Sequence, residues 1–459
     1  MVINPTLTNV ERRIYAINWL SNCNGGKVFT SQADSDQFAQ DQIAAALVNP
    51  GITGDNPADT NDGIKKFDVV WGPYTSASQD TTDNNSDAWV TDNSVFVAKQ
   101  KQDDSTMLYV VGVAGTNANS FQGWFIEDLD VGELATLPWD ASSGKIIANG
   151  AAAGASKLIN LPAEGAHIAP QDGGESISKT LNTDIANLPK SITKVDVAVS
   201  GHSLGGALSP VFALYLKSVL TDSRVSVAAY PTAGPSAGTQ DYVNLLATLD
   251  YKSLWNTKDI VPHAWDHNYI AELDIIYSSE IEAGAITKGC IYWASKQPPS
   301  ESTYKQADFH FSFSPKLYDL GIYGSIIDSF EKAIADIIAG KKPEEKLPPG
   351  LINDLKEIYH ACHSGPIGDL GIPEAALRFM KYMAQAGMQH TKAYVSAFFE
   401  GFSDSETFIK AITPYVAYTE TPTVKLEEES NLMDFLDIVA DYLRTHGPSD
   451  KDCSCKVSK

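Results

Sequence analysis

The stretch KVDVAVSGHSLGGALSPVFALYL, residues 194–216, contains two patterns that together decide the fold. Alternating valines end at Gly201, and after Gly205 and Gly206 the apolar residues return at the spacing of a helix. The stretch therefore predicts a buried strand that turns directly into a helix, with the motif G-x-S-x-G at the turn.

The serine of this motif, Ser203, is a candidate nucleophile. At such a turn the two flanking glycines let the strand and the helix approach closely, which raises the serine hydroxyl above the sheet. The N-terminus of the expected helix, 203–218, favours developing negative charge, and the Leu204 N–H is a natural oxyanion donor. A serine hydroxyl is a weak nucleophile by itself, so we expect a histidine base and an acid, in the chain order Ser, Asp, His.

The composition indicates a globular protein that acts on a neutral substrate. The 459 residues are 43% hydrophobic, which suits one large enzyme domain or two ordinary ones, and the net charge is −23. A field of this sign repels phosphate backbones and anionic lipid headgroups. We therefore expect no nucleic-acid partner.

The sequence leaves the compartment open. The five cysteines are odd in number and scattered, which favours free or buried thiols over a disulfide framework. The first twenty residues lack a basic region followed by a continuous apolar run, and no apolar run is long enough to span a bilayer. We expect a soluble protein without a visible signal peptide or transmembrane segment, either cytoplasmic or a secreted mature form.

Strand-like and helical patterns alternate along much of the chain, which predicts an α/β fold. Amphipathic helices are expected at 8–23 and 36–49, strands at 67–71, 93–99 and 107–115, and strand-then-loop segments at 224–238 and 251–262. The Gly/Ala-rich residues 141–156 suggest an insertion or a mobile cover, and residues 316–388 turn helical.

Four segments resemble, in the same order, the class 3 lipases, the fungal-type triacylglycerol lipase family of the α/β-hydrolase fold. VSGHSLGGALS resembles the nucleophile region of that family, and VVGVAGTNANSFQGWFIEDL resembles its oxyanion strand. TAGPSAG resembles its G-x-P-x-x-G turn, and NTKDIVPHAW resembles its D-I-V-P acid loop. The match covers roughly residues 107–265.

This resemblance implies roles for three residues. Ser203 would be the nucleophile and Asp259 the acid, while Thr116 matches the oxyanion residue, which would donate its backbone N–H and its hydroxyl. One departure is clear, because the arginine usual before Gly115 is Ala114 here. Its absence affects a supporting salt-bridge network more than catalysis.

Two histidines are candidates for the base. His390 in QHTKAY resembles the Q-H-x-x-x-Y element of bacterial and plant-like members, with Tyr394 at its end. His310 in ADFHFSF resembles the compact spacing of the fungal members. We favour His390, which implies a large insertion between about 270 and 388.

The other histidines are assigned different roles. His202 stands beside the nucleophile, where family members use it for packing, and we group it with His263 as residues that line the substrate pocket. His267, like His263, follows Asp259 too closely to act as base. His360 and His363 flank Cys362 in HACH, which we interpret as a helix surface rather than a metal site.

Aromatic residues after Thr116 predict an apolar wall for an acyl chain. The substrate-binding candidates there are Phe121, Trp124 and Phe125. Residues 320–339 have apolar positions at helical spacing, which fits core packing better than a lid over a lipid interface.

Taken together, the sequence predicts an α/β-hydrolase fold with a mostly parallel central sheet, flanking helices and helical insertions. Residues 1–402 would form this domain, including the insertion at about 316–388, and 403–459 a helical appendage with a charged tail. The expected activity is cofactor-free, lipase-like hydrolysis of acylglycerols or other neutral lipid esters through an acyl-enzyme, with transient contact to a lipid interface. The alternatives are a phospholipase, a short-chain or aromatic esterase, and a catalytically silent binding module.

Overall fold

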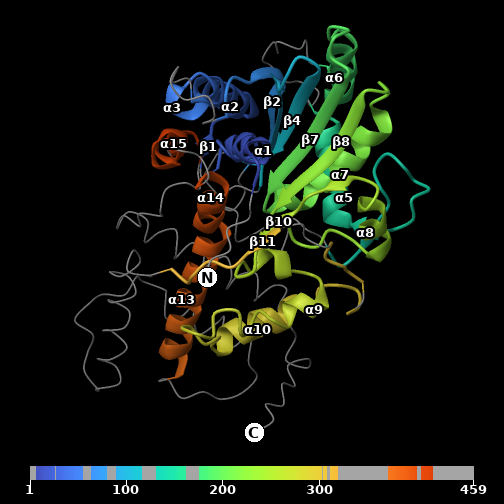
Figure 1. Ribbon diagram of the computed structural model, residues 1–459. Coiled ribbons are helices and arrows are strands. Elements are labelled where there is room, and N and C mark those ends of the chain that lie inside the picture. Colours follow the sequence, from blue (N-terminus) through green and yellow to red (C-terminus); the bar gives the residue numbers. More distant parts are fainter. Residues whose placement is uncertain are drawn as a thin grey trace.

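A mixed sheet forms the centre of the molecule (Figure 1). The computed structural model describes residues 7–25, 27–54, 64–79, 89–115, 131–161, 175–301, 303–307, 311–318, 371–400 and 405–416. Within these ranges nine strands pair in the order β1-β3-β4-β7-β8-β10-β11, with β2 added beside β3 and β9 beside β8. The sheet is therefore continuous from the N-terminal strands to the segment after residue 310.

The strands from β4 onward are parallel, and those before it are antiparallel. The parallel part consists of β4 (Thr106–Val113), β7 (Lys194–His202), β8 (Val225–Thr232), β9 (Asp250–Tyr251), β10 (Leu254–Asn256) and β11 (Phe311–Phe313). The antiparallel part consists of β1 (Val28–Phe29), β2 (Asp68–Gln79) and β3 (Trp89–Lys101). The expected mostly parallel sheet with α/β-hydrolase-type architecture is thus present.

The central strands are buried on both faces, as their continuous apolar runs predict. Successive residues of a strand point to opposite faces, and β4 follows this rule. Tyr109 and Val111 pack into one hydrophobic core, whereas Leu108 and Val110 pack into the other. The sheet therefore separates two apolar layers.

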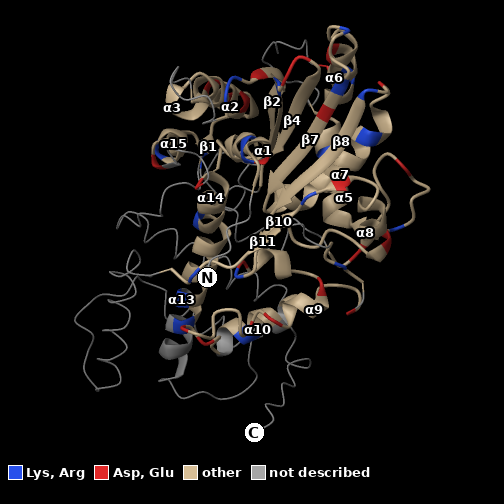
Figure 2. Ribbon diagram, viewed as in Figure 1, with Lys and Arg blue, Asp and Glu red and all other residues tan. Residues whose placement is uncertain are grey.

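Helices cover each face of the sheet (Figure 1). One face carries α1 (Asn9–Leu20), α2 (Gln32–Leu47), α3 (Pro50–Thr53), α14 (Lys392–Phe399) and α15 (Ser405–Ile412). The opposite face carries α5 (Asn149–Ile159), α6 (Ile177–Ala186), α7 (Leu204–Val219) and α8 (Gln240–Leu246). Lys, Arg, Asp and Glu residues lie mostly on these outer helices and on the loops, with both signs intermixed (Figure 2).

A third hydrophobic cluster lies beyond the end of β10. There α13 (Gly371–His390) packs with α10 (Ala285–Ala294) and the segment that follows α9 (His267–Ile270). The Tyr382 hydroxyl of α13 donates to the Leu273 carbonyl at 2.6 Å. This contact anchors the helix whose last residue is His390.

The Gly/Ala-rich segment at 141–156 is neither an insertion nor a mobile cover, and that expectation was wrong. Residues 149–159 form α5, which packs on α7 with Ala151, Ala155 and Leu158 fully buried. The reason is steric, because small side chains let two helices approach closely. A Cβ on Gly154 would lie 2.9 Å from Leu208 of α7.

The C-terminal part of the described chain packs onto the N-terminal helices. Phe408 and Ile412 of α15 belong to the same core as α1, and Asn49 donates to the Tyr415 hydroxyl at 3.3 Å. A domain boundary at 402 stays a prediction. Most of the expected helical insertion, with the segment 320–339, and the tail after 416 lie outside the described residues.

The turn from β7 into α7 brings backbones into direct contact. A Cβ on Gly201 would lie 2.0 Å from the Gly205 carbonyl oxygen, and a Cβ on Gly205 would lie 2.4 Å from the Val113 oxygen of β4. Because backbone atoms cannot rotate away as side chains can, only hydrogen fits at these two positions. The G-x-S-x-G spacing is therefore a packing requirement of the turn.

We expect Gly205→Ala to lower the free energy of unfolding by about 3 kcal/mol or more, since the added methyl group must push β4 away from α7. Chemical denaturation followed by circular dichroism measures this loss. Gly387→Ala in α13 is the matched control, because a Cβ there meets nothing within 4 Å. It should change stability by no more than about 1 kcal/mol, and an equal loss in both variants would contradict the packing argument.

Candidate active site

Ser203 occupies the sharp turn between β7 and α7. Its backbone has φ 62° and ψ −125°, a left-handed conformation that costs a non-glycine residue about 1–3 kcal/mol. The surrounding hydrogen bonds hold it there, because its N–H donates to the Thr232 carbonyl of β8 at 3.0 Å. The Ser203 side chain makes no capping bond to α7, so its hydroxyl is not used to start the helix.

Asp259 lies in the turn that follows β10, fully buried and surrounded by donors. Its Oδ1 accepts from the Val261 N–H at 3.0 Å. Its Oδ2 accepts from His390 Nδ1 at 2.8 Å and from the Tyr394 hydroxyl at 3.0 Å. With Nδ1–H directed at the carboxylate, a neutral His390 ring has Nε2 as its acceptor.

Tyr394 connects the acid to the end of β10. Its hydroxyl accepts from the Asn256 N–H at 2.8 Å while it donates to Asp259. Burial, and next the negative charge of Asp259, raise the pKa of Tyr394 well above its usual range, so the hydroxyl remains a donor. The Asn256 amide donates to the Gln389 carbonyl at 2.9 Å and to its side-chain oxygen at 2.7 Å, which fixes the residue before His390.

Asn256 and Gln389 were not predicted from the sequence to support the site. Both belong to quoted motifs, since Asn256 opens NTKDIVP and Gln389 opens the Q-H-x-x-x-Y element. Their position inside those motifs was the available signal. That they bind each other is a tertiary contact between residues far apart in the chain, which no local pattern indicates.

His202 packs between the turn and the Asp259–His390 pair. Its ring centroid lies 4.7 Å from that of Trp19 and 4.8 Å from that of His390. Its Nδ1 lies 3.0 Å from the Thr232 hydroxyl. Burial, and next the neighbouring His390, hold the pKa of His202 well below its usual range, so the ring is neutral.

His263 supports the turn that carries Asp259. Its Nδ1 lies 2.7 Å from the Asp259 carbonyl oxygen, so this nitrogen donates, and the ring stacks on Trp255 at a centroid distance of 5.2 Å. Burial lowers its pKa. His263 and His202 are only 2% and 1% exposed, which leaves little surface for a substrate. Their assignment to substrate binding stays a prediction.

The topology brings these elements to one edge of the sheet. Since β7, β8 and β10 are parallel, the turns after them lie at the same edge. Ser203 follows β7, and Asp259 follows β10. The ring of His202, the residue before Ser203, contacts the ring of His390. Leu204, the expected oxyanion donor, is the first residue of α7 and is 4% exposed.

Several predicted site residues lie outside the described part of the chain: Thr116, Phe121, Trp124, Phe125, His310, His360, Cys362 and His363. Phe311, which follows His310 in the sequence, pairs with Leu254, the first residue of β10. Asp259 follows the other end of β10.

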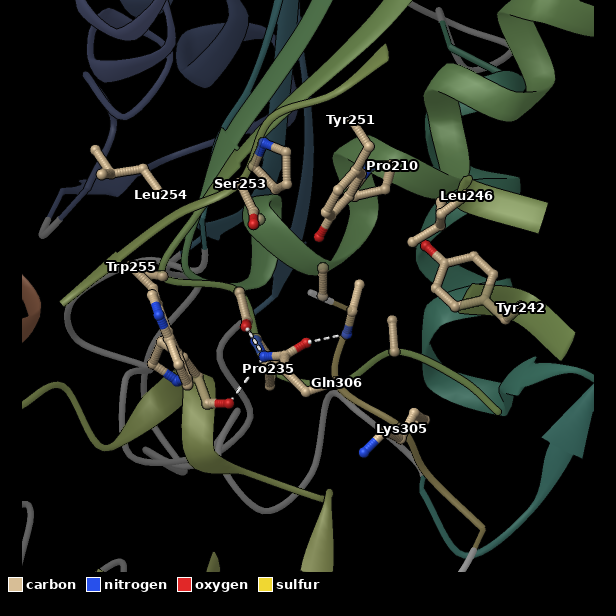
Figure 3. Close-up of a pocket in the computed structure, with 18 residues that line it drawn as sticks. Pro210, Pro235, Tyr242, Leu246, Tyr251, Ser253, Leu254, Trp255, Lys305 and Gln306 are labelled. Carbon is tan, nitrogen blue, oxygen red and sulfur yellow. Dashed lines mark hydrogen bonds between the residues drawn. The ribbon is translucent and has the colours of Figure 1, made fainter. Parts of the chain in front are cut away.

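A narrow pocket lies beside the start of α7 and reaches Tyr242, Tyr251 and Trp255 (Figure 3). At its wall the Gln306 side-chain amide donates to the carbonyls of Gly234 and Pro262, at 2.9 and 2.8 Å. Gln306 therefore joins the loop after β8 to the loop that carries Asp259. Ser203 and His390 are not among the residues that line this pocket.

The described residues contain neither a cluster of metal ligands nor a helix that could span a membrane. No group of three or more His, Cys, Asp or Glu side chains within them is arranged to hold a metal ion. No helix among them has the length and apolar character needed to cross a membrane.

Comparison with known proteins shows what part of this chain is similar to. Residues 86–268 match the family model described as lipase (class 3). The M37 lipase crystal structure aligns with a TM-score of 0.56 at 20% identity, covering 89% of this chain and 99% of that one. A comparison with curated protein sequences gives no significant match.

Two further lipase structures align over smaller parts of the chain. A triacylglycerol lipase with a serine protease triad at its catalytic centre aligns at 19% identity over 56% of this chain and 74% of its own, with a TM-score of 0.30. The Rhizomucor miehei lipase propeptide complex aligns at 17% identity over 57% and 66%, with a TM-score of 0.33. Residues 86–268 of this chain are therefore similar to the lipase (class 3) family, and the first alignment shows a lipase-like fold of the α/β-hydrolase type.

Proposed function

We propose that the protein is a serine carboxylic-ester hydrolase of lipase type, with Ser203 as nucleophile, His390 as base and Asp259 as acid. The observation that carries the proposal is the buried 2.8 Å contact between His390 Nδ1 and Asp259 Oδ2, at the sheet edge where Ser203 turns into α7. The class 3 lipase match supports ester hydrolysis in general.

In the proposed mechanism Asp259 holds His390 with Nε2 as acceptor. Nε2 takes the Ser203 proton as the serine oxygen attacks the ester carbonyl, and Asp259 stabilises the imidazolium that forms. His390 then returns the proton to the departing alcohol. A water activated by His390 attacks the acyl-enzyme, which releases the carboxylic acid and restores Ser203. The scheme uses no cofactor.

The negative charge of the tetrahedral intermediate requires preorganised donors. We assign this role to the N–H groups of Leu204 and Thr116. The 16-residue helix α7 begins at Leu204, so its N-terminal partial positive charge also acts at this point. The role of Thr116 rests on the family resemblance alone.

Two observations favour His390 over His310 as the base. His390 lies at the carboxylate itself, with Asn256, Gln389 and Tyr394 fixing its surroundings. The strand that follows His310 begins level with Leu254, at the end of β10 away from Asp259. The proposal therefore places a long segment of chain between acid and base.

For the substrate, we propose an acylglycerol or another neutral lipid ester, reached through transient contact with a lipid interface. The net charge of −23 disfavours anionic headgroups, and Phe121, Trp124 and Phe125 are the proposed apolar wall. A phospholipase and a short-chain or aromatic esterase would use the same three residues. A silent binding module would have no reason to keep the acid and base paired beside a strained serine.

Replacing single residues tests the mechanism. Ser203→Ala and His390→Ala should each reduce kcat for p-nitrophenyl butyrate by about 10⁴-fold, because each removes a group that acts in every turnover. His310→Ala should retain activity within a few-fold of the wild type. Loss of activity in His310→Ala together with an active His390→Ala would overturn the assignment of the base.

The substrate class is tested with p-nitrophenyl esters from two to sixteen carbons and with emulsified triacylglycerol against phosphatidylcholine. A lipase should prefer medium or long chains and cleave the neutral emulsion faster. A preference for acetate would instead indicate a short-chain esterase, and a preference for phosphatidylcholine a phospholipase. Absence of covalent labelling of Ser203 by a fluorophosphonate would favour the silent binding module.

The buried neutral histidines predict a pH dependence of stability. The lowered pKa of His202 means that below its unfolded value of about 6.5 the unfolded chain binds a proton that the folded protein does not. Stability is therefore fully present above about pH 6.5 and falls below it, by up to about 1.4 kcal/mol per pH unit for one histidine.

Urea unfolding of the wild type and of His202→Gln at pH 7.5 and 5.5 measures how much His202 contributes to the pH dependence of the free energy of unfolding. The variant should lose less free energy of unfolding between the two pH values, whatever its stability at pH 7.5. His263→Gln should show a similar reduction, since burial also lowers the pKa of His263. Identical losses in wild type and both variants would show that neither ring is kept neutral by the fold.

A further inference from the structure

We propose that Asn22 is a positioning residue for this hydrolysis, which acts by holding Gly115 at the end of β4 against the turn that carries Ser203. The inference rests on the proposed function. Asn22 follows α1 and is separated from Gly115 by more than 90 residues of chain. It does not touch the substrate in this proposal, since it acts through the backbone of Gly115.

The Asn22 side chain is oriented by bonds at both ends. Its Oδ1 accepts from the Gly115 N–H at 2.9 Å, in a buried contact. Its Nδ2 points back to the carbonyls of Asn18 and Trp19 in the last turn of α1, at 3.3 and 3.4 Å. The reverse orientation would direct an N–H group at another N–H group, so the amide has one satisfied arrangement.

Gly115 lies against the serine turn itself. A Cβ there would be 2.7 Å from the His202 carbonyl oxygen and 3.2 Å from the Ser203 Cβ. The preceding amide, Ala114 N–H, still bonds to the Ser94 carbonyl of β3 at 2.8 Å. Gly115 is thus the point where the end of β4 passes from bonding within the sheet to bonding with Asn22.

The hydrogen bond between Gly115 and Asn22 also indicates which backbone N–H groups near Ser203 are left for the oxyanion. Because the Gly115 N–H is used by Asn22, it is not a donor for the oxyanion, which leaves the proposed donors at Leu204 and Thr116. Because Gly115 packs directly on the serine turn, a displacement of Gly115 would disturb the position of Ser203 and of the Leu204 N–H that follows it.

The α1 helix is a firm base for this contact. Arg12 donates to the Phe398 carbonyl at 2.6 Å, and Tyr15 stacks on the Phe398 ring at a centroid distance of 4.7 Å. Ala114, the residue before Gly115, has no polar side chain that could support the turn. In this chain Asn22 supports the turn. It lies just after α1, which packs on the same face of the sheet as Phe398 of α14.

A matched control lies two residues away. Asn22 and Asn24 are 3% and 2% exposed and line the same small pocket. The Asn24 amide, however, donates to Ser35 and Thr91, which are outside the serine turn. Asn22→Ala and Asn24→Ala each remove a buried side-chain amide. Only Asn22→Ala also removes the hydrogen-bond acceptor of the Gly115 N–H.

The experiment compares Asn22→Ala and Asn24→Ala in the full chain, with kcat and KM for p-nitrophenyl butyrate expressed per Ser203 titrated by fluorophosphonate. Thermal unfolding of both variants accompanies the kinetics. We expect both midpoints to fall, because each variant loses buried hydrogen bonds. Only Asn22→Ala should lose kcat, by about 10- to 100-fold with KM within twofold of the wild type, which is less than removal of an oxyanion donor.

A second readout separates positioning from stability. A butyl boronic acid, which adds to the serine as a tetrahedral anion, should bind Asn22→Ala more weakly by the same factor as the loss in kcat. Its affinity for Asn24→Ala should equal that for the wild type. If Asn22→Ala does not fold, Asn22→Ser carries the same prediction, because its shorter side chain does not reach Gly115 as the amide does.

Failures of the two proposals are distinguishable. Equal kcat and boronic acid affinity in the Asn22 and Asn24 variants, with an active wild type, would overturn the role of Asn22 and leave the ester hydrolase proposal intact. A rise in KM without loss of kcat would overturn it too. Wild-type hydrolysis no faster than that of Ser203→Ala would overturn the proposed function and, with it, the role of Asn22.

Discussion

The contact between the backbones of β4, β7 and α7 is the constraint on which the rest of the structure depends. Gly201 and Gly205 leave no room for a methyl group, so the strand and the helix meet at van der Waals distance. This contact holds Ser203 in a left-handed conformation, and its side chain makes no capping bond to α7. The strain persists because the turn is bonded to β8 and enclosed by two hydrophobic layers.

A buried carboxylate is the second constraint, and it recruits distant parts of the chain. Removing Asp259 from water is costly unless donors surround it. Those donors come from its own turn, from the end of α13 and from α14, and Tyr394 is itself bonded to the last residue of β10. The helical segment at 371–399 therefore has to dock on the sheet edge for the acid to be accommodated, which would place the base there in the proposed mechanism.

Local patterns predicted the parts of the fold that depend on neighbouring residues. The apolar run at 107–115 predicted a strand buried on both faces, and the glycine spacing at 201–205 predicted the turn. The Gly/Ala-rich segment at 141–156 was misread because alanine carries little hydrophobic signal, although the helix that forms there packs well against α7. The amide of Asn22 has no local signature at all, since its partner Gly115 lies on a strand far along the chain.

The sequence by itself determined the element order, the strained turn with Ser203 and the family resemblance, because each of these is written in residues close together in the chain. It favoured His390 over His310 as the base through resemblance to a motif, with no spatial contact to support the choice. Only the tertiary structure decided which side chains surround Asp259, which amide supports Gly115 and that α5 belongs to the core. These are contacts between segments separated by tens to hundreds of residues, and their partners are fixed by the packing of the whole sheet rather than by any local pattern.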